Sequence, residues 1–405
     1  MRVAPVLVAI VSFARAADAP ATVVSEDEAD PIHSAILRGE AWTQDSVRRL
    51  RAEADRRMKE GPWSVTFDRP KAAGLDAHEY YSESPFWWPD PINPGGPYIR
   101  REAAPNPDRF MANRTALNSL CDAIFTLGSA AFLLDEPRYA QRASRLVQTW
   151  FLNPKTRMSP SLDHAQSIPG PPPAPGATAA SWGWPALDGR PLIRAVQGME
   201  FLAQAGGWDA RDQAAIHRWF EDYLHWLAQN GPGPGKGTGG DRAWWAAQSA
   251  AVATFVEDDA AARRAFGYYR DRIFPREIRA EAGSVRAEPR RAPEFFSTDL
   301  DGITTLCRIA QIRGVDLWSA RSRSGATLAT LIDALEPALA DPKRAREPLA
   351  APESGAYFLA FAGMGLNRPD YVALFRKLDH HESAWLALVD LLVGRWEAAA
   401  HQTRH

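Results

Sequence analysis

The residues best suited to chemistry in this sequence are arginines that could hold a carboxylate. From Arg263 to Arg291 there are nine arginines against four acidic residues. Most of them fit a solvated helix face, but Arg290 and Arg291 fall between helix-like segments, beside the aromatic run "APEFFSTDL". A planar guanidinium can bind a carboxylate through two parallel hydrogen bonds. The pair therefore favours an acidic carbohydrate as ligand.

Aromatic side chains and a histidine add to this interpretation. A tryptophan offers a flat apolar face and one donor, which suits sugar rings, and the chain has 15 of them. We expect Trp87 or Trp88, with Tyr81, to form one wall of a sugar site, and Tyr98 lies in the same segment. His164 lies in a second irregular segment, where it could act as a general base near neutral pH.

Carboxylates that could serve a glycoside hydrolase are also present. Such enzymes need two of them on either side of the scissile bond. The candidates are Asp163, Asp241, Glu294 and Asp299.

Other kinds of site are disfavoured. His380 and His381 are adjacent, so their rings diverge on a helix, and we expect neither a metal site nor a cofactor. The run "GPGPGKGTGG" (231–240) lacks the spacing of a phosphate-binding loop. Cys121 and Cys307 lie in apolar helical patterns that predict buried thiols. The net charge of −2 argues against nucleic acid as a partner, and no apolar run is long enough to span a bilayer.

The elements that must position these residues are helices. Apolar residues recur with a period of 3.6 from Asn113 onward, and we find no run of alternating strand residues. Two long irregular segments, 76–110 and 153–189, interrupt the helices and are expected to carry function. After the segments that begin at Asn113 and near Tyr139, helices are expected near 190–205, 210–229, 242–256, 260–273, 299–313, 322–338, 353–364, 367–378 and 383–398.

The N-terminus predicts export. Met1 and Arg2 give a positive start, an apolar stretch follows, and "ARA" (14–16) fits a cleavage site. We therefore expect a signal peptide over residues 1–17, a single domain over 18–405, and a periplasmic or secreted protein.

Three segments resemble the alginate lyase family, polysaccharide lyases built on an α/α toroid. They are "EYYSESPFWWPDPINPGGPYIRREAAPNPDRF" (79–110), "TRMSPSLDHAQSIPG" (156–170) and "GVDLWSA" (314–320), and the resemblance covers about residues 45 to 340. It implies an all-α toroid, an incomplete barrel of helical hairpins, with a site for uronic-acid polymers and no cofactor. It also implies that Tyr98 and Arg100 bind substrate.

The sequence departs from the family where its catalytic residues are expected. The family carries Asn-Asn-His-Gly-x-Trp-Tyr-x-x-Gln at the start of a central helix, and this chain has "GGDRAWWAAQ" (239–248). Trp244 and Gln248 match, and Asp241 stands where His is expected. We expect Arg242, Trp244 and Gln248 to bind substrate and Asp241 to lie at the catalytic centre. In the next motif an arginine is kept, at Arg290 or Arg291. The family's Tyr gives way to two phenylalanines, Phe295 and Phe296.

These departures leave three functions open. β-Elimination needs the uronate charge neutralised and a base for the C5 proton, and Phe supplies neither. The leading expectation is a lyase with a rebuilt site, in which Arg290 or Arg291 acts with His164 or Tyr81. A hydrolase using Asp241 and a second carboxylate is the alternative. The third is a protein that binds glycan without cleaving it.

Overall fold

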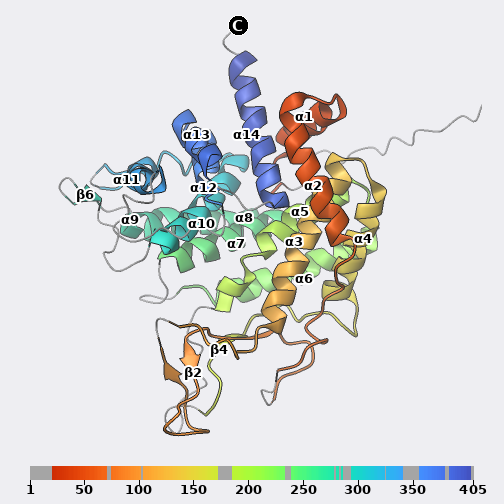
Figure 1. Ribbon diagram of the computed structural model, residues 1–405, viewed down its shortest axis with the longest axis vertical. Helices are drawn as coiled ribbons and strands as arrows, with labels where there is room; N and C mark the ends of the chain where they lie inside the picture. The colour runs from red at the N-terminus through yellow and green to blue at the C-terminus, as the bar shows by residue number, and fades with distance from the viewer. Residues whose placement is uncertain are drawn as a thin grey trace, which may run out of the picture.

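Helices make up most of the protein in its computed structural model (Figure 1). The structure describes residues 21–70, 74–101, 104–171, 185–232, 239–277, 280–281, 284–285, 293–323, 325–340, 355–378 and 383–402. The helices are α1 (Glu26–Leu37), α2 (Gln44–Arg57), α3 (Ala112–Leu133), α4 (Pro137–Val147), α5 (Leu192–Gln204), α6 (Ala210–Gln229), α7 (Gly239–Phe255), α8 (Asp259–Tyr268), α9 (Phe274–Glu277), α10 (Pro293–Ile312), α11 (Leu328–Ala340), α12 (Phe358–Gly365), α13 (Pro369–Lys377) and α14 (Ala384–Gln402). Short helical turns η1 (Ala41–Thr43), η2 (Gln148–Leu152), η3 (Pro185–Gly189) and η4 (Tyr269–Ile273) join or extend them.

Local signals explain where several helices begin. Ser25 and Glu28 form a reciprocal capping box at the start of α1. The Asp209 and Asp258 side chains accept hydrogen bonds from backbone N–H groups in the first turns of α6 and α8. Proline occupies the first turn of α4 and α13, where its missing N–H costs nothing.

Alternate helices pack into a ring. Contacts run from α3 to α5, then to α7, α10, α12 and α14, and α14 also touches α3. The intervening helices lie outside: α4 packs on α3 and α5, α6 and α8 on α7, and α13 on α12. The all-α toroid is therefore confirmed. Because each outer helix returns the chain, the ring helices run the same way, and their N-termini lie at one end.

The ring helices are buried on most of their surface, as their position requires. From Ala123 to Leu133 every side chain of α3 is buried. By length and composition α3 could cross a membrane, but 83% of its apolar window is buried inside the molecule, so it is a core helix. Gly128 of α3 and Gly198 of α5 lie face to face, and a Cβ on Gly198 would come within 2.5 Å of the Phe125 Cα. Glycine at these positions lets the two helices approach closely.

The two irregular segments meet beyond the helices. Strand β1 (Tyr81–Glu83), from the first, pairs in parallel with β4 (His164–Ser167), from the second. Strand β2 (Trp87–Trp88) pairs antiparallel with β3 (Ile99–Arg100). Figure 1 shows β2 and β4 below the helices, at one end of the molecule. A third short ladder joins β5 (Ala280–Glu281) and β6 (Ser284–Val285).

The N-terminal segment Thr22–Val24 is held inside the ring. All three residues are buried. The Gln197 Oε1 of α5 accepts the N–H groups of Val23 and Val24 at 2.7 and 2.8 Å, and the Arg308 Nε of α10 donates to the Val23 carbonyl at 3.0 Å. The expected signal peptide lies outside the described residues.

Both cysteines are buried and free, as their helical patterns predicted. Cys121 lies on α3 and Cys307 on α10.

Candidate active site

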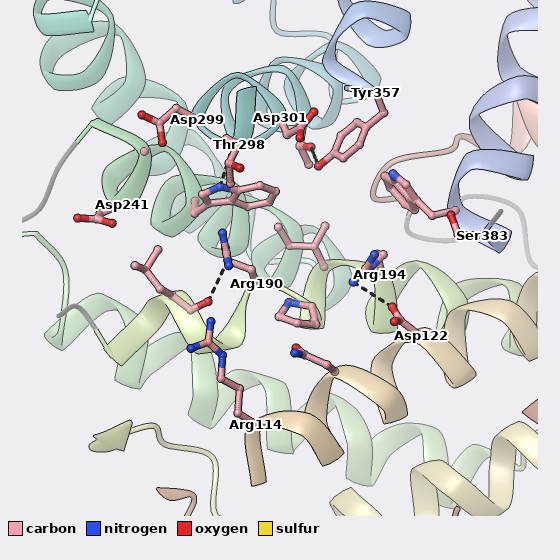
Figure 2. Close-up of a pocket in the computed structure, with 18 of the residues that line it drawn as sticks. Arg114, Asp122, Arg190, Arg194, Asp241, Thr298, Asp299, Asp301, Tyr357 and Ser383 are labelled. Carbon is pink, nitrogen blue, oxygen red and sulfur yellow. Dashed lines mark hydrogen bonds and ion pairs between the residues drawn. The ribbon is translucent and has the colours of Figure 1, made fainter. Parts of the chain in front are cut away.

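A cavity of about 960 Å³ lies among the N-terminal parts of the ring helices. Figure 2 shows side chains from all sides converging on it. Its lining includes residues from α3 (Arg114, Asn118, Asp122), from the turn between η3 and α5 (Arg190), from α5 (Ile193, Arg194), from α7 (Gly240, Asp241, Trp244), from α10 (Thr298, Asp299, Asp301, Thr305), from the start of α12 (Tyr357), from α14 (Trp385, Leu386), and from the irregular segments (Pro85, Phe86, Gln166).

Three arginines give the cavity a basic side. Arg194 pairs with Asp122 across the gap between α5 and α3, at 2.9 Å. Arg114 lies 3.6 Å from the buried carboxylate of Asp188. Arg190 has no carboxylate within ion-pair distance among the residues that the structure describes. The N-termini of parallel helices add positive potential at the same end of the ring.

Arg190 is the arginine best prepared for an external anion. Its Nε donates to the Leu187 carbonyl at 3.2 Å, and its guanidinium lies over the Trp244 ring, 5.5 Å from the centroid. Burial, followed by the nearby Arg114, lowers the pKa of Arg190. A cation in this environment gains from an anionic ligand, because its partial burial weakens its solvation by water.

Tyr357 presents a hydroxyl on the opposite side. This hydroxyl is 3.3 Å from the Thr305 Oγ1 of α10. Burial, then the charge of Asp301, raises the pKa of Tyr357 far above its ordinary value, while Arg194 and Arg190 act in the opposite direction. The Asp301 Oδ1 accepts the N–H of Phe358 at 3.0 Å and so fixes the start of α12 beside Tyr357.

The altered motif at the start of α7 reaches the cavity. Asp241 lies in the first turn of the helix and lines the cavity with Trp244. The Trp244 indole N–H donates to the Thr298 carbonyl at 3.0 Å, which ties α7 to α10. A Cβ on Gly240 would fall 1.5 Å from the Asp299 Oδ1, so only glycine lets this carboxylate lie against the helix.

Arg242 and Gln248 lie behind this surface. Both are buried and neither is among the residues that line the cavity. The Gln248 Nε2 donates to the Ala186 carbonyl at 2.8 Å, and its Oε1 accepts the Tyr223 hydroxyl at 3.1 Å. In this arrangement Gln248 ties α7 to η3.

The predicted residues of the irregular segments lie outside the cavity lining. Tyr81 is buried, its hydroxyl donates to Glu83, and its Cα pairs with that of His164 across β1 and β4. The His164 Nε2 is 3.7 Å from Glu79. From the segment 76–110, Pro85 and Phe86 line the cavity.

The tryptophan pair and its neighbours belong to the β2–β3 ladder. Trp87 and Trp88 are half-buried, the Trp88 indole donates to the Ala104 carbonyl at 2.9 Å, and Arg101 lies over its ring. Tyr98 is half-buried and Arg100 is exposed. None of these residues lines the cavity, so their sugar contacts stay a prediction.

Several residues of the sequence prediction have no described side chain. Arg290 and Arg291 lie outside the described residues, and so do the side chains of Glu294, Phe295 and Phe296 at the start of α10. Their roles stay predictions.

Sequence reasoning missed the arginines of the cavity, although a signal for them exists. Arg114, Asn118 and Asp122 are each four residues apart, and so are Arg190 and Arg194. This spacing puts polar side chains on one face of helices that are otherwise apolar. Tyr357 gave no such signal, because it stands among apolar residues and looks like a core tyrosine.

The described parts of the chain hold no cluster of metal-ligating side chains. No group of three or more His, Cys, Asp or Glu side chains there could hold a metal ion.

Several solved structures have a similar fold. The structure matches an alginate lyase from Bacteroides ovatus with a TM-score of 0.80 and 21% identity, over 92% of this chain and 99% of the other. It matches alginate lyase A1-III from Sphingomonas species A1 with a TM-score of 0.50 and 14% identity, over 80% and 89%. A variant of A1-III in complex with a tetrasaccharide gives 0.50 and 15%, over 79% and 84%.

The two comparisons made with the sequence differ in outcome. No curated protein matches this sequence. The sequence profile of the alginate lyase family, in contrast, matches residues 65–345, which include the irregular segments, the cavity arginines and the start of α7. Since that match spans more than half of the chain and the fold agrees with it, the chain belongs to the alginate lyase family.

Proposed function

We propose that this protein is a polysaccharide lyase that cleaves a uronate-containing, alginate-like glycan by β-elimination in the 960 Å³ cavity. One observation carries the proposal: Arg190 is a desolvated cation without a described carboxylate partner, and it shares the cavity with the Tyr357 hydroxyl. Membership of the alginate lyase family supports the same reaction class.

The chemistry asks for two things. The C5 proton of a uronate is removed, the bond from C4 to the glycosidic oxygen breaks, and a C4–C5 double bond forms. Charge gathers on the carboxylate as the proton leaves, so a cation held against it stabilises the transition state. The leaving oxygen also needs a proton.

Arg190 and Tyr357 fill these two roles in the proposal. The Arg190 guanidinium binds the uronate carboxylate, and the face of Trp244 fixes its orientation. Tyr357 takes the C5 proton and returns it to the leaving oxygen. Burial and the charge of Asp301 raise the pKa of Tyr357, and the charges of Arg194 and Arg190 partly offset this rise in favour of the phenolate.

A direct assay tests the proposal. Incubation of the purified protein with alginate should produce the ultraviolet absorbance of the C4–C5 double bond. New reducing ends without that absorbance would select hydrolysis, and binding without either product would select a glycan-binding protein.

Arg190 gives the first site-specific prediction. Replacement by Ala should lower kcat/KM by at least about 30-fold, because a hydrogen bond to a charged group is worth about 2 kcal/mol. Arg218→Ala, at an exposed position of α6, is the matched control and should leave kcat/KM unchanged. Equal activity of both variants would rule out Arg190 as the carboxylate ligand.

A further inference from the structure

A buried carboxylate lies directly behind the cavity. Asp188 belongs to η3, and its side chain is 0% exposed. Its Oδ2 accepts the hydroxyls of Tyr80 and Ser82 at 2.9 and 2.5 Å, and its Oδ1 accepts the Gln166 Nε2 at 3.0 Å. An ionised carboxylate accepts hydrogen bonds and donates none, so all three donors are satisfied at once.

These donors come from both irregular segments. Tyr80 immediately precedes β1, Ser82 lies within β1, and Gln166 lies on β4. The Ser82 Oγ also accepts the backbone N–H of Gln166 at 2.9 Å, which joins the two segments at the same point. Asp188 is therefore the place where both segments are tied to the ring.

The same carboxylate faces one of the cavity arginines. The Arg114 Nε lies 3.6 Å from the Asp188 Oδ1, and the Arg114 side chain is 24% exposed, on the cavity side. The charge of Asp188 thus lies against the Nε edge of the guanidinium. Figure 2 shows the Arg114 head group directed toward the cavity.

A second cavity arginine depends on the same turn. Arg190 follows Asp188 by two residues, and its Nε donates to the Leu187 carbonyl of η3. The turn is clamped on its far side too. A Cβ on Gly189 would come within 2.1 Å of the Tyr223 hydroxyl and 2.5 Å of the Gln248 Oε1.

We propose that Asp188 is the positioning residue of the site: its buried carboxylate sets the orientation of Arg114 and, through η3, of Arg190 toward the substrate carboxylate. This inference rests on the proposed function. Asp188 itself is sealed from the cavity and touches no substrate. A displacement of about 1 Å at such a support can cost about 100-fold in rate.

The test compares a variant that removes the charge of Asp188 with two variants that each remove one hydrogen-bond donor to it. Asp188→Asn keeps the size of the side chain and loses its charge. Tyr80→Phe and Ser82→Ala each take away one hydroxyl and leave the Asp188 charge in place. Activity on alginate, affinity for an alginate oligosaccharide by calorimetry, and the melting temperature are measured for each.

We expect Asp188→Asn to lower kcat/KM about 10- to 100-fold and to weaken oligosaccharide binding. Tyr80→Phe and Ser82→Ala should lower the melting temperature with kcat/KM within about threefold of wild type. A double variant that combines Asp188→Asn with Arg114→Ala distinguishes positioning of Arg114 from a purely structural role of Asp188. If Asp188 acts through Arg114, the double variant loses less than the product of the two single losses.

Three outcomes would overturn the inference. They are unchanged kcat/KM in Asp188→Asn, equal losses in the three variants, and full multiplicative losses in the double variant. If the wild type neither cleaves nor binds alginate, the proposed function fails by itself. The crystal structure of Asp188→Asn then decides on positioning: Arg114 must turn away from its wild-type direction, and an unmoved Arg114 contradicts it.

Discussion

The polar residues of the cavity divide between one side rich in arginine and another that carries the tyrosine. Arg190 comes from the turn before α5, Arg194 from the first turn of α5, and Tyr357 from the start of α12. The carboxylate ligand and the proton carrier would therefore approach a sugar ring from different helices.

Tyr357 predicts an alkaline pH dependence. Its reactive form as a base is the phenolate, and burial raises its pKa above the ordinary value of 10.0. The phenolate fraction therefore grows about tenfold for each pH unit below that pKa. We expect kcat/KM to rise from about pH 6 to about pH 10 without reaching a plateau.

Replacement of the same residue checks the assignment. Tyr357→Phe should lower kcat by about 100-fold or more, the usual size of a lost acid–base contribution. Tyr139→Phe is the control, because it also removes a phenolic hydroxyl, one that donates to Asp55 and lies away from the cavity. An optimum near pH 7 in the wild type would instead indicate a histidine base such as His164.

Asp241 separates a lyase from a hydrolase. The lyase account gives it no proton to carry, and Asn keeps its size, so Asp241→Asn should retain kcat within about threefold. The loss of a negative charge from the first turn of α7 costs only about 0.3–1 kcal/mol of stability. A fall in kcat of two or more orders of magnitude, at an unchanged melting temperature, would identify a catalytic carboxylate and favour hydrolysis.

At the scale of helices and strands, the period of apolar residues predicted most of the ring. The segment expected at 210–229 is α6 itself, and those near 190–205 and 367–378 are α5 and α13 to within three residues. Buried faces produce this agreement, because each helix has neighbours on a fixed side. The paired strands were not predicted, since ladders of two to four residues are too short to show a period.

Substitution by alanine is expected to have opposite effects on stability at two helical glycines, one in the close contact of α3 and α5 and one on α8. Gly198→Ala should destabilise the protein by about 1–3 kcal/mol or more, because its Cβ meets the backbone of Phe125 and Ile124. Gly267 of α8 has open space around its Cβ position, so Gly267→Ala should stabilise the protein by up to about 1 kcal/mol. Urea unfolding measures both, and an unchanged or increased stability of Gly198→Ala would refute the close packing of α3 and α5.

The N-terminal segment predicts how stability depends on pH. The Glu200 carboxylate accepts the N–H and the hydroxyl of Thr22, at 3.0 and 2.5 Å. Burial raises the pKa of Glu200 from 4.5 to about 8, although these hydrogen bonds oppose the shift. Between these values the folded protein keeps a proton that the unfolded chain releases, so unfolding becomes easier as the pH rises.

The expected loss of unfolding free energy is about 1.4 kcal/mol for each pH unit between about pH 5 and about pH 8. Glu200→Gln cannot ionise and should not show this loss. Urea titrations of both proteins across that range give the difference. A constant difference between them would mean that Glu200 titrates at an ordinary pKa in the folded protein.

At the scale of the whole molecule, the toroid explains why the sequence predicted the fold better than the site. The cavity takes residues from α3, α5, α7, α10 and α14, which span most of the chain. Of the described residues that we predicted for catalysis or binding, Asp241, Trp244 and Asp299 line it. Closure of the ring brings the remaining cavity residues together, and no local sequence pattern predicts which helix N-termini will meet.

The position of a uronate carboxylate in the cavity tests the central claim most directly. A crystal of the Tyr357→Phe variant with an alginate oligosaccharide would show it without turnover. We predict the carboxylate within hydrogen-bond distance of the Arg190 guanidinium, with the C5 atom of that sugar facing position 357. A sugar chain held by Arg290 or Arg291 alone, or along Trp87 and Trp88 outside the cavity, would contradict the account.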